Sequence, residues 1–134
     1  MKKLNQYLSF AALLLLAIVI ISGCKKKDDP VVPAFTLTST EVTLVGNVPG
    51  LQFFAKCNND DVKMTKVTIS NPIGSINLTY NLNGGIFVKN EIFGLQADNT
   101  GYEKSTGAWK FNFVGNRTAD GSSFAVDGSL TISK

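Results

Sequence analysis

Apolar and polar residues alternate with a period of two along most of the chain from Ala34 onward. Such alternation is typical of β-strands with one buried face, because successive side chains of a strand point to opposite sides. No apolar set with helical spacing follows Ile21. We predict these inward-facing rows: Phe35 and Leu37; Val42 and Leu44; Leu51, Phe53, Ala55 and Cys57; Thr65, Val67 and Ile69; Ile76, Leu78 and Tyr80; Ile86, Val88 and Ile92; Trp109, Phe111 and Phe113; Phe124, Val126, Leu130 and Ile132.

Short groups of Asn, Asp, Pro and Gly separate these rows. Asn83-Gly84 is the strongest hairpin signal, because both central residues of a type I′ turn need positive φ. The other expected turns are Pro49-Gly50, Asn58 to Asp61 (as a hairpin loop), Asn71 to Gly74, and Asp120-Gly121. Seven or eight short strands joined in this way predict an antiparallel, immunoglobulin-like β-sandwich over residues 34–134, with a small β-barrel as the alternative.

The beginning of the chain has a different pattern. Lys2 and Lys3 precede an uninterrupted apolar run of twelve residues from Phe10 to Ile21. A membrane-spanning helix needs about 20 apolar residues, so the run is short for a span and fits the apolar region of an export signal. We therefore expect residues 1–23 to be a cleaved signal helix, with an uncleaved N-terminal anchor as the alternative.

Four residues at the end of this run, Ile21-Ser22-Gly23-Cys24, resemble the lipobox of bacterial lipoproteins. The resemblance implies that the thiol of Cys24 receives a diacylglyceryl group, that cleavage precedes this cysteine, and that its new amino group is acylated. Small residues before the cysteine leave room for a peptidase and a bulky lipid. Several long acyl chains then anchor the protein to a membrane, since each buried methylene contributes about 0.8 kcal/mol.

Residues 24–33 are then expected to be the lipidated cysteine and a flexible tether, kept extended by Pro30 and Pro33. The charged run from Lys25 to Asp29 is similar to the tether signals of Bacteroidetes-type surface lipoproteins, although these charges are also explained as residues that solvate a linker. The resemblance implies a lipid-anchored envelope protein, held in the outer membrane on its periplasmic face or at the cell surface.

The charge balance and the absence of histidine exclude several classes of partner and site. The formal net charge is +3, but from Ala34 onward eight basic and eight acidic residues balance, which gives a nucleic-acid partner no electrostatic basis. The chain has no histidine, and this removes the usual general base and the histidine-rich zinc sites. Cys57 is in phase with Phe53 and Ala55, so we expect a buried thiol rather than a nucleophile. No metal site or cofactor is expected.

Three phenylalanines, Phe54, Phe87 and Phe93, are out of phase with the predicted inward rows. If the alternation holds, their rings point away from the core and together form a contact patch for a ligand. The alternative is that a bulge or a covering loop buries them.

The longest stretch without a strand pattern runs from Gln96 to Gly107. Tyr102 within it is a candidate to stack on a sugar ring or a peptide, or else to fold back on the sandwich. Asp98, Asn99 and Glu103 are candidate calcium ligands, but their spacing does not match an EF-hand and also suits an ordinary turn.

These observations favour a non-enzymatic binding or assembly-support domain on a lipid anchor, whose partner is an envelope protein or a glycan. A glycan-binding surface module is one alternative. The other is a hydrolase that works without histidine, using Asp, Glu, Lys, Ser or Tyr alone, and turnover that is lost on replacing Asp98 or Glu103 would support it.

Overall fold

The computed structural model describes residues 31–96 and 101–134, so the predicted signal helix, Cys24, Asp98 and Asn99 lie outside the described residues. Val32–Lys134 forms one compact unit. Its strands are β1 (Phe35–Leu44), β2 (Val48–Cys57), β3 (Val62–Ser70), β4 (Asn77–Phe87), β5 (Ile92–Gly94), β6 (Tyr102–Glu103), β7 (Gly107–Arg117) and β8 (Ser123–Ile132).

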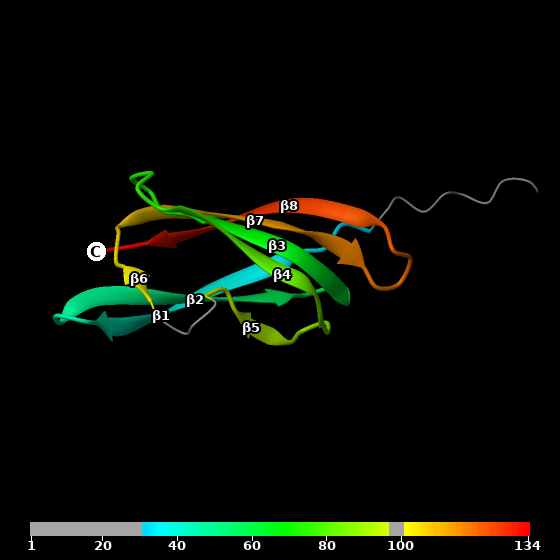
Figure 1. Ribbon diagram of the computed structural model, residues 1–134, viewed down its shortest axis with the longest axis horizontal. Coiled ribbons are helices and arrows are strands. Elements are labelled where there is room, and N and C mark those ends of the chain that lie inside the picture. Colours follow the sequence, from blue (N-terminus) through cyan, green and yellow to red (C-terminus); the bar gives the residue numbers. More distant parts are fainter. Residues whose placement is uncertain (1–30, 97–100) are drawn as a thin grey trace, which may run out of the picture. The chain divides into compact units, whose positions relative to one another are not determined.

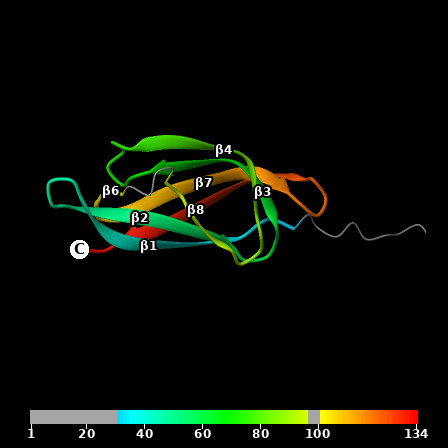
Figure 2. The same ribbon diagram turned by 60° about the horizontal axis from the view of Figure 1, so that its bottom comes forward.

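The strands form two sheets that lie face to face (Figures 1 and 2). Sheet A has the order β1-β2-β5, with β6 also paired to β2, and sheet B has the order β4-β3-β7-β8. All of these pairings are antiparallel. The predicted all-β sandwich is therefore confirmed, and β1-β2-β5 facing β3-β7-β8 is the immunoglobulin-like division of strands. The barrel alternative is wrong, because no described strand pairs with strands of both sheets.

Aromatic side chains from both sheets fill the space between the layers. Trp109 and Phe53 are fully buried, and their ring centroids lie 4.7 Å apart. The indole N–H of Trp109 donates a hydrogen bond to the carbonyl oxygen of Ser105 at 3.0 Å, so this buried polar group is satisfied. The rows of β2 and β7 face inward as predicted, and Cys57 is a buried free thiol.

Two of the five expected turns join paired neighbouring strands. Residues 71–74 lie between β3 and β4, where the N–H of Gly74 donates to the carbonyl of Asn71, and Asp120-Gly121 lies between β7 and β8. Residues 58–61 are not a hairpin loop, because they carry the chain from sheet A to sheet B. Pro49-Gly50 is not a turn either. It lies inside β2, and Gly46 and Asn47, both with positive φ, form the β1–β2 turn.

Asn83-Gly84 has the backbone expected of a hairpin turn but occurs within a strand. Both residues have positive φ, 50° and 73°, and both lie inside β4. Here the register places Leu82 to Gly84 opposite Thr65 alone, so the pair forms an irregularity in the sheet. Thr65, predicted to face inward, is exposed, and the fully buried Met64 occupies the core beside it.

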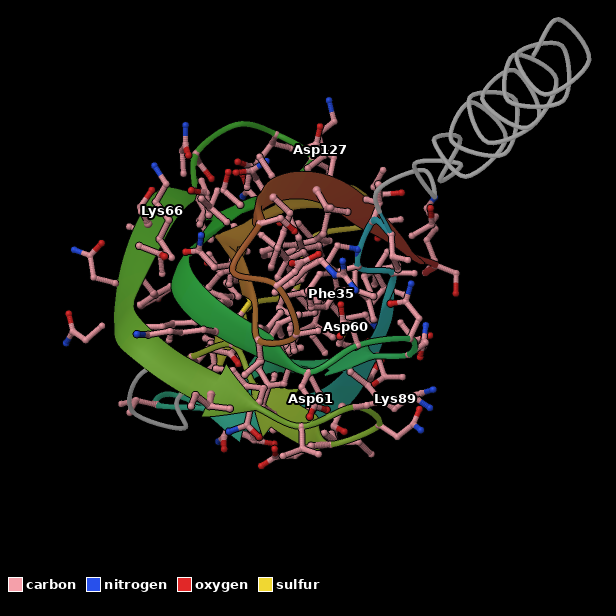
Figure 3. All side chains as sticks on the ribbon, turned by 90° about the vertical axis from the view of Figure 1, so that its right-hand side faces the viewer. Phe35, Asp60, Asp61, Lys66, Lys89 and Asp127 are labelled. Carbon is pink, nitrogen blue, oxygen red and sulfur yellow. The ribbon has the colours of Figure 1, made fainter. Side chains whose placement is uncertain are left out.

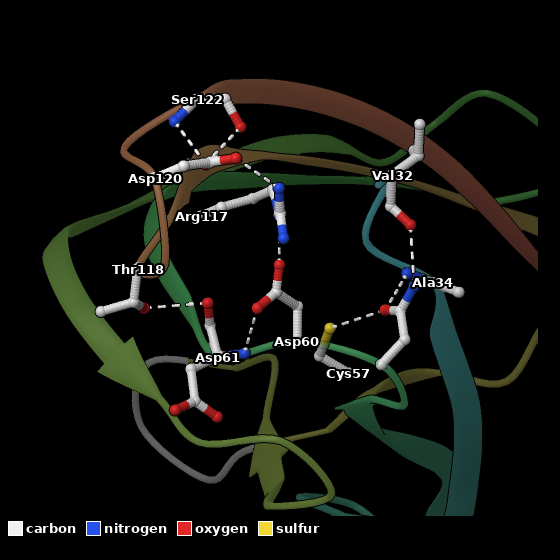
Figure 4. A network of polar contacts seen from close by, with 10 residues as sticks. Val32, Ala34, Cys57, Asp60, Asp61, Arg117, Thr118, Asp120 and Ser122 are labelled. Carbon is white, nitrogen blue, oxygen red and sulfur yellow. Dashed lines mark hydrogen bonds and ion pairs between the residues drawn. The ribbon is translucent and has the colours of Figure 1, made fainter. Parts of the chain in front are cut away.

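Pro33 also differs from the expectation, because its side chain is fully buried rather than part of a flexible tether. Asn59 holds the adjoining residues with two hydrogen bonds. Its amide nitrogen donates to the carbonyl of Val32 at 2.9 Å, and its amide oxygen accepts the N–H of Ala34 at 2.9 Å (Figure 4). The chain is thus fixed to the sandwich from Val32 onward, beside the 58–61 loop. We call this the proximal end. The C-terminus lies at the opposite, distal end (Figure 1).

Candidate functional site

The three phenylalanines predicted to form an exposed patch do not meet on one surface. Phe93 is only 7% exposed, and its ring stacks on that of the half-buried Phe87 with centroids 4.2 Å apart. Both rings pack between the sheets. In their place Ile86, Val88 and Ile92, predicted to face inward, are 62%, 54% and 68% exposed.

In β4 the inversion begins at the irregularity at Asn83-Gly84, whereas in β5 it follows from strand pairing, because Phe93 lies opposite the inward-facing Ala55 of β2. Before the irregularity, the even-numbered residues Tyr80 and Leu82 pack against the core, and after it the odd-numbered Phe87 does. The buried residues of β3 change phase at the same place, from Met64 to Val67, so the shift is odd in both strands and reverses which face the side chains beyond it occupy. The alternative reading, that a bulge buries these rings, is the one the structure supports. Phe54 alone lies on the outer side of its strand, half-buried, opposite Thr38 and Gly94 in the register.

Tyr102 also belongs to the core rather than to an exposed loop. It is 9% exposed, and its ring lies 6.1 Å from Phe53 and 5.8 Å from Trp109. Its hydroxyl is hydrogen-bonded to the hydroxyl of Tyr80, which links β6 to β4 across the two sheets. Trp109 and Tyr102 are therefore not available as a platform for a sugar ring.

The segment between β5 and β6 is attached to β2 by a side chain. The amide oxygen of Gln96 accepts the N–H of Phe53 at 3.1 Å, and its amide nitrogen donates to the carbonyl of Leu51 at 3.2 Å. The amide group of Gln96 thus makes the two hydrogen bonds to the backbone of β2 that a neighbouring strand would otherwise make. Glu103, the described member of the calcium candidates, is exposed on β6. Across residues 31–96 and 101–134 no cluster of His, Cys, Asp or Glu is arranged to hold a metal ion.

A shallow groove of about 470 Å³ lies on the outer face of sheet B. Alternation along each strand turns Ile69 and Phe111 inward and their polar neighbours outward. β3, β7 and β8 each contribute two polar side chains. These residues are Thr68, Ser70, Lys110, Asn112, Asp127 and Ser129.

The register arranges these side chains in two rows across the sheet. Asn112 is opposite both Thr68 and Asp127, while Lys110 is opposite both Ser70 and Ser129. Neighbouring side chains in such rows have Cβ atoms about 5 Å apart. The polar groove therefore combines hydroxyls, an amide, a carboxylate and an ammonium group within a small area. Figure 3 shows Asp127 pointing away from the interior, in contrast to Phe35.

Hydrogen bonds within the rows fix the orientation of several groups. The amide nitrogen of Asn112 donates to a carboxylate oxygen of Asp127 at 2.7 Å, which leaves the amide oxygen of Asn112 as an acceptor for another partner. The hydroxyls of Thr68 and Thr79 are 2.9 Å apart. Such a surface can donate and accept hydrogen bonds at several fixed positions at once. The groove could not be predicted from the sequence, because the outward-facing residues do not indicate which strands lie next to one another.

A second polar cluster, at the proximal end, has a structural explanation (Figure 4). The guanidinium group of Arg117 forms ion pairs with Asp60, from the 58–61 loop, and with Asp120, from the β7–β8 hairpin. The side chains of Arg117 and Asp60 are 13% and 11% exposed. The hydrogen bond to Asp60 raises the pKa of Arg117. The hydroxyl and N–H of Ser122 lower the pKa of Asp120, and the charge of Arg117 acts in the same direction. This cluster joins the loop to the hairpin.

Comparisons with protein-family models, with curated proteins and with solved structures found no match for this chain. In the part of the chain that the structure describes, no helix has the length and apolar character required to cross a membrane. The polar groove on sheet B is therefore interpreted from its own geometry.

Proposed function

We propose that this protein is a lipid-anchored protein of a bacterial cell envelope, and that its β-sandwich is a non-enzymatic binding domain that uses the polar groove of sheet B. The anchor part of the proposal is supported by the apolar run before Ile21-Ser22-Gly23-Cys24. The single observation that carries the binding part is the groove itself, whose polar side chains come from three adjacent strands.

The chemistry of the groove favours a glycan as the ligand. A sugar presents many hydroxyls, each able to donate and accept, and the groove offers both kinds of group in two regular rows. The rings of Trp109 and Tyr102 are buried, so binding would depend on hydrogen bonds rather than on aromatic stacking. A shallow open groove also suits a chain of sugar units lying across the strands better than a small molecule, which usually needs an enclosed pocket.

The binding part is tested with an array of bacterial surface and cell-wall glycans, followed by titration of the glycans that bind. Asp127→Ala removes a carboxylate from one row, and Lys110→Ala removes the ammonium group from the other. Loss of a hydrogen bond to a charged group should weaken binding about tenfold. Lys66→Ala is the matched control, because Lys66 is an exposed lysine of the same sheet that does not line the groove.

Binding that is unchanged in both groove variants, or equally weakened in the Lys66→Ala control, would contradict this assignment. The absence of binding to every glycan on the array would do the same. The anchor part is tested separately by mass spectrometry of the cell-borne protein, which should begin at a triacylated Cys24. A protein that retains Met1, or whose Cys24 carries no lipid, would overturn it.

A further inference from the structure

Three large aliphatic side chains are exposed within the seven residues that run from the end of β4 through the β4–β5 connection to the start of β5, a segment called here the Ile86–Ile92 connection. Ile86 is 62%, Val88 54% and Ile92 68% exposed. The inward packing of Phe87 and Phe93, which stack on each other, turns their neighbours Ile86 and Ile92 outward. Ile86 thus lies on the outer side of sheet B and Ile92 on the outer side of sheet A, with the exposed Val88 in the chain between them.

Hydrogen bonds place this connection at the proximal end. The N–H of Lys89 donates to a carboxylate oxygen of Asp61 at 2.7 Å, and the N–H of Asn90 donates to the carbonyl of Cys57 at 2.8 Å. The 58–61 loop also holds Val32 through the side chain of Asn59. The exposed aliphatic residues therefore lie at the same end of the sandwich as the point where the chain joins it. Figure 3 looks onto this end, with Asp61 and Lys89 toward the viewer.

Lysines accompany the three aliphatic residues. Lys63 is opposite Ile86 in the register, Lys56 is opposite Ile92, and Lys89 follows Val88 in the chain. Among the described residues none of these lysines is in an ion pair.

Of the carboxylates nearby, two are ion-paired, and the other two accept backbone N–H groups and keep their charge, so the three lysines outnumber the unpaired carboxylates. Arg117 pairs with Asp60 and Asp120, Asp61 accepts the N–H of Lys89, and Glu91 accepts the N–H of Val88. Exposed aliphatic groups with adjacent ammonium groups are the features that bind a surface of anionic lipids.

We propose that the Ile86–Ile92 connection rests on the lipid headgroups of the membrane that holds the anchor, and so fixes the orientation of the sandwich. This inference rests on the proposed function, because it requires the lipid on Cys24. Cys24 lies eight residues before Val32, a length of chain that spans at most about 28 Å. The proximal end thus cannot leave the vicinity of the membrane. A protein partner would have to displace a lipid surface that is always within reach.

The test uses the lipidated protein, reconstituted in vesicles of phosphatidylethanolamine and phosphatidylglycerol. A bimane label is attached at Val88→Cys or, as the matched control, at Val45→Cys. Val45 is fully exposed and lies in the β1–β2 turn at the distal end, far from the predicted contact (Figure 1). Cys57 is buried and should not react. A nitroxide group near the headgroup end of the acyl chain quenches labels that enter the interface.

We expect quenching and a blue shift of emission at position 88, and neither at position 45. Adding Ile86→Ser and Ile92→Ser to the Val88→Cys protein should reduce the quenching, as should replacing the phosphatidylglycerol with phosphatidylcholine. No quenching at position 88, or equal quenching at both positions, would overturn the proposal. A label unquenched in vesicles but shielded from iodide in native membranes would also overturn it, in favour of a protein partner. The mass of the N-terminal peptide reports on the anchor independently, so a missing lipid and a missing contact are told apart.

Discussion

In β5 it is Phe93, and not Ile92 as the sequence pattern predicts, that faces the core, and this can be tested by truncating each of the two residues. The sequence pattern predicts that Ile92 faces the core and Phe93 the solvent, whereas the structure has Ile92 68% exposed and Phe93 7% exposed. Both residues belong to the same short strand and pair with β2. Replacing each by alanine therefore compares two side chains in nearly the same backbone setting, and the difference reports on burial.

The expected magnitudes follow from these exposures. Truncating a buried phenylalanine to alanine usually costs 3–5 kcal/mol, and Phe93→Ala should be near the lower limit, about 3 kcal/mol, because an edge strand can partly relax. Complete burial of an isoleucine contributes about 1.5–3 kcal/mol. Since about a third of Ile92 is buried, Ile92→Ala should cost less than about 1 kcal/mol. A domain of this size has about 5–15 kcal/mol of stability, so both variants should fold.

Urea unfolding followed by tryptophan fluorescence measures both changes. Trp109 is the single tryptophan and is fully buried, so its emission should shift when the core opens. With a slope of about 1.5 kcal/mol per molar urea, the midpoint should fall by about 2 M for Phe93→Ala and by less than about 0.7 M for Ile92→Ala. A larger loss of stability in Ile92→Ala than in Phe93→Ala would refute the phase of β5 and the burial of the Phe87–Phe93 pair.

Three further predictions concern local packing and charge. Gly115→Ala should lower the free energy of unfolding by about 1–3 kcal/mol, because its Cβ would lie 2.4 Å from the carbonyl oxygen of Lys63, whereas Gly94→Ala has no atom within 4 Å and should be nearly neutral in the same urea titration. Gln96→Leu should lower the free energy of unfolding by about 1–3 kcal/mol, because the N–H of Phe53 and the carbonyl of Leu51 lose their partner. Amide hydrogen exchange should become faster in β2, and unchanged exchange would contradict the contact. The hydrogen bonds from Ser122, aided by the charge of Arg117, lower the pKa of Asp120, and this adds stability that is present above its ordinary pKa of about 3.8 and is lost as the pH falls through the lower folded value. Asp120→Asn should therefore flatten the acid limb of a stability–pH profile, and an unaltered limb would count against these contacts of Asp120.

Much of the fold was predictable because alternation is a local property of the chain. Within β2 and within β7 the alternation has no interruption, and every apolar residue of the predicted row faces the core. The turn at residues 71–74 could also be predicted, because Pro and Gly restrict or permit backbone angles whatever the rest of the chain does. The same applies to the positive φ of Asn83 and Gly84, which the structure has at both residues.

The candidate site was hidden from the sequence because it depends on pairing between distant strands. Asn112 and Asp127 are fifteen residues apart, and only the β7–β8 register brings the amide to 2.7 Å from the carboxylate. Thr68 joins them because β3 pairs with β7, a neighbour that no local pattern identifies. The outward side chains of the groove therefore appear in the sequence only as ordinary polar positions.

The sequence by itself determined that the body consists of β-strands, which residues make the heaviest core rows, and two of the chain reversals, at residues 71–74 and at Asp120-Gly121. Only the tertiary structure decided that Asn83-Gly84 interrupts a strand instead of ending one. It turned Phe87 inward and Ile86 outward, while the pairing of β5 with β2 placed Phe93 opposite the inward-facing Ala55 and left Ile92 outward. The physical reason is that the side-chain period of a strand is two, so an odd shift along a strand reverses its two faces, and whether the partner strand accommodates it is decided by contacts far away in the sequence.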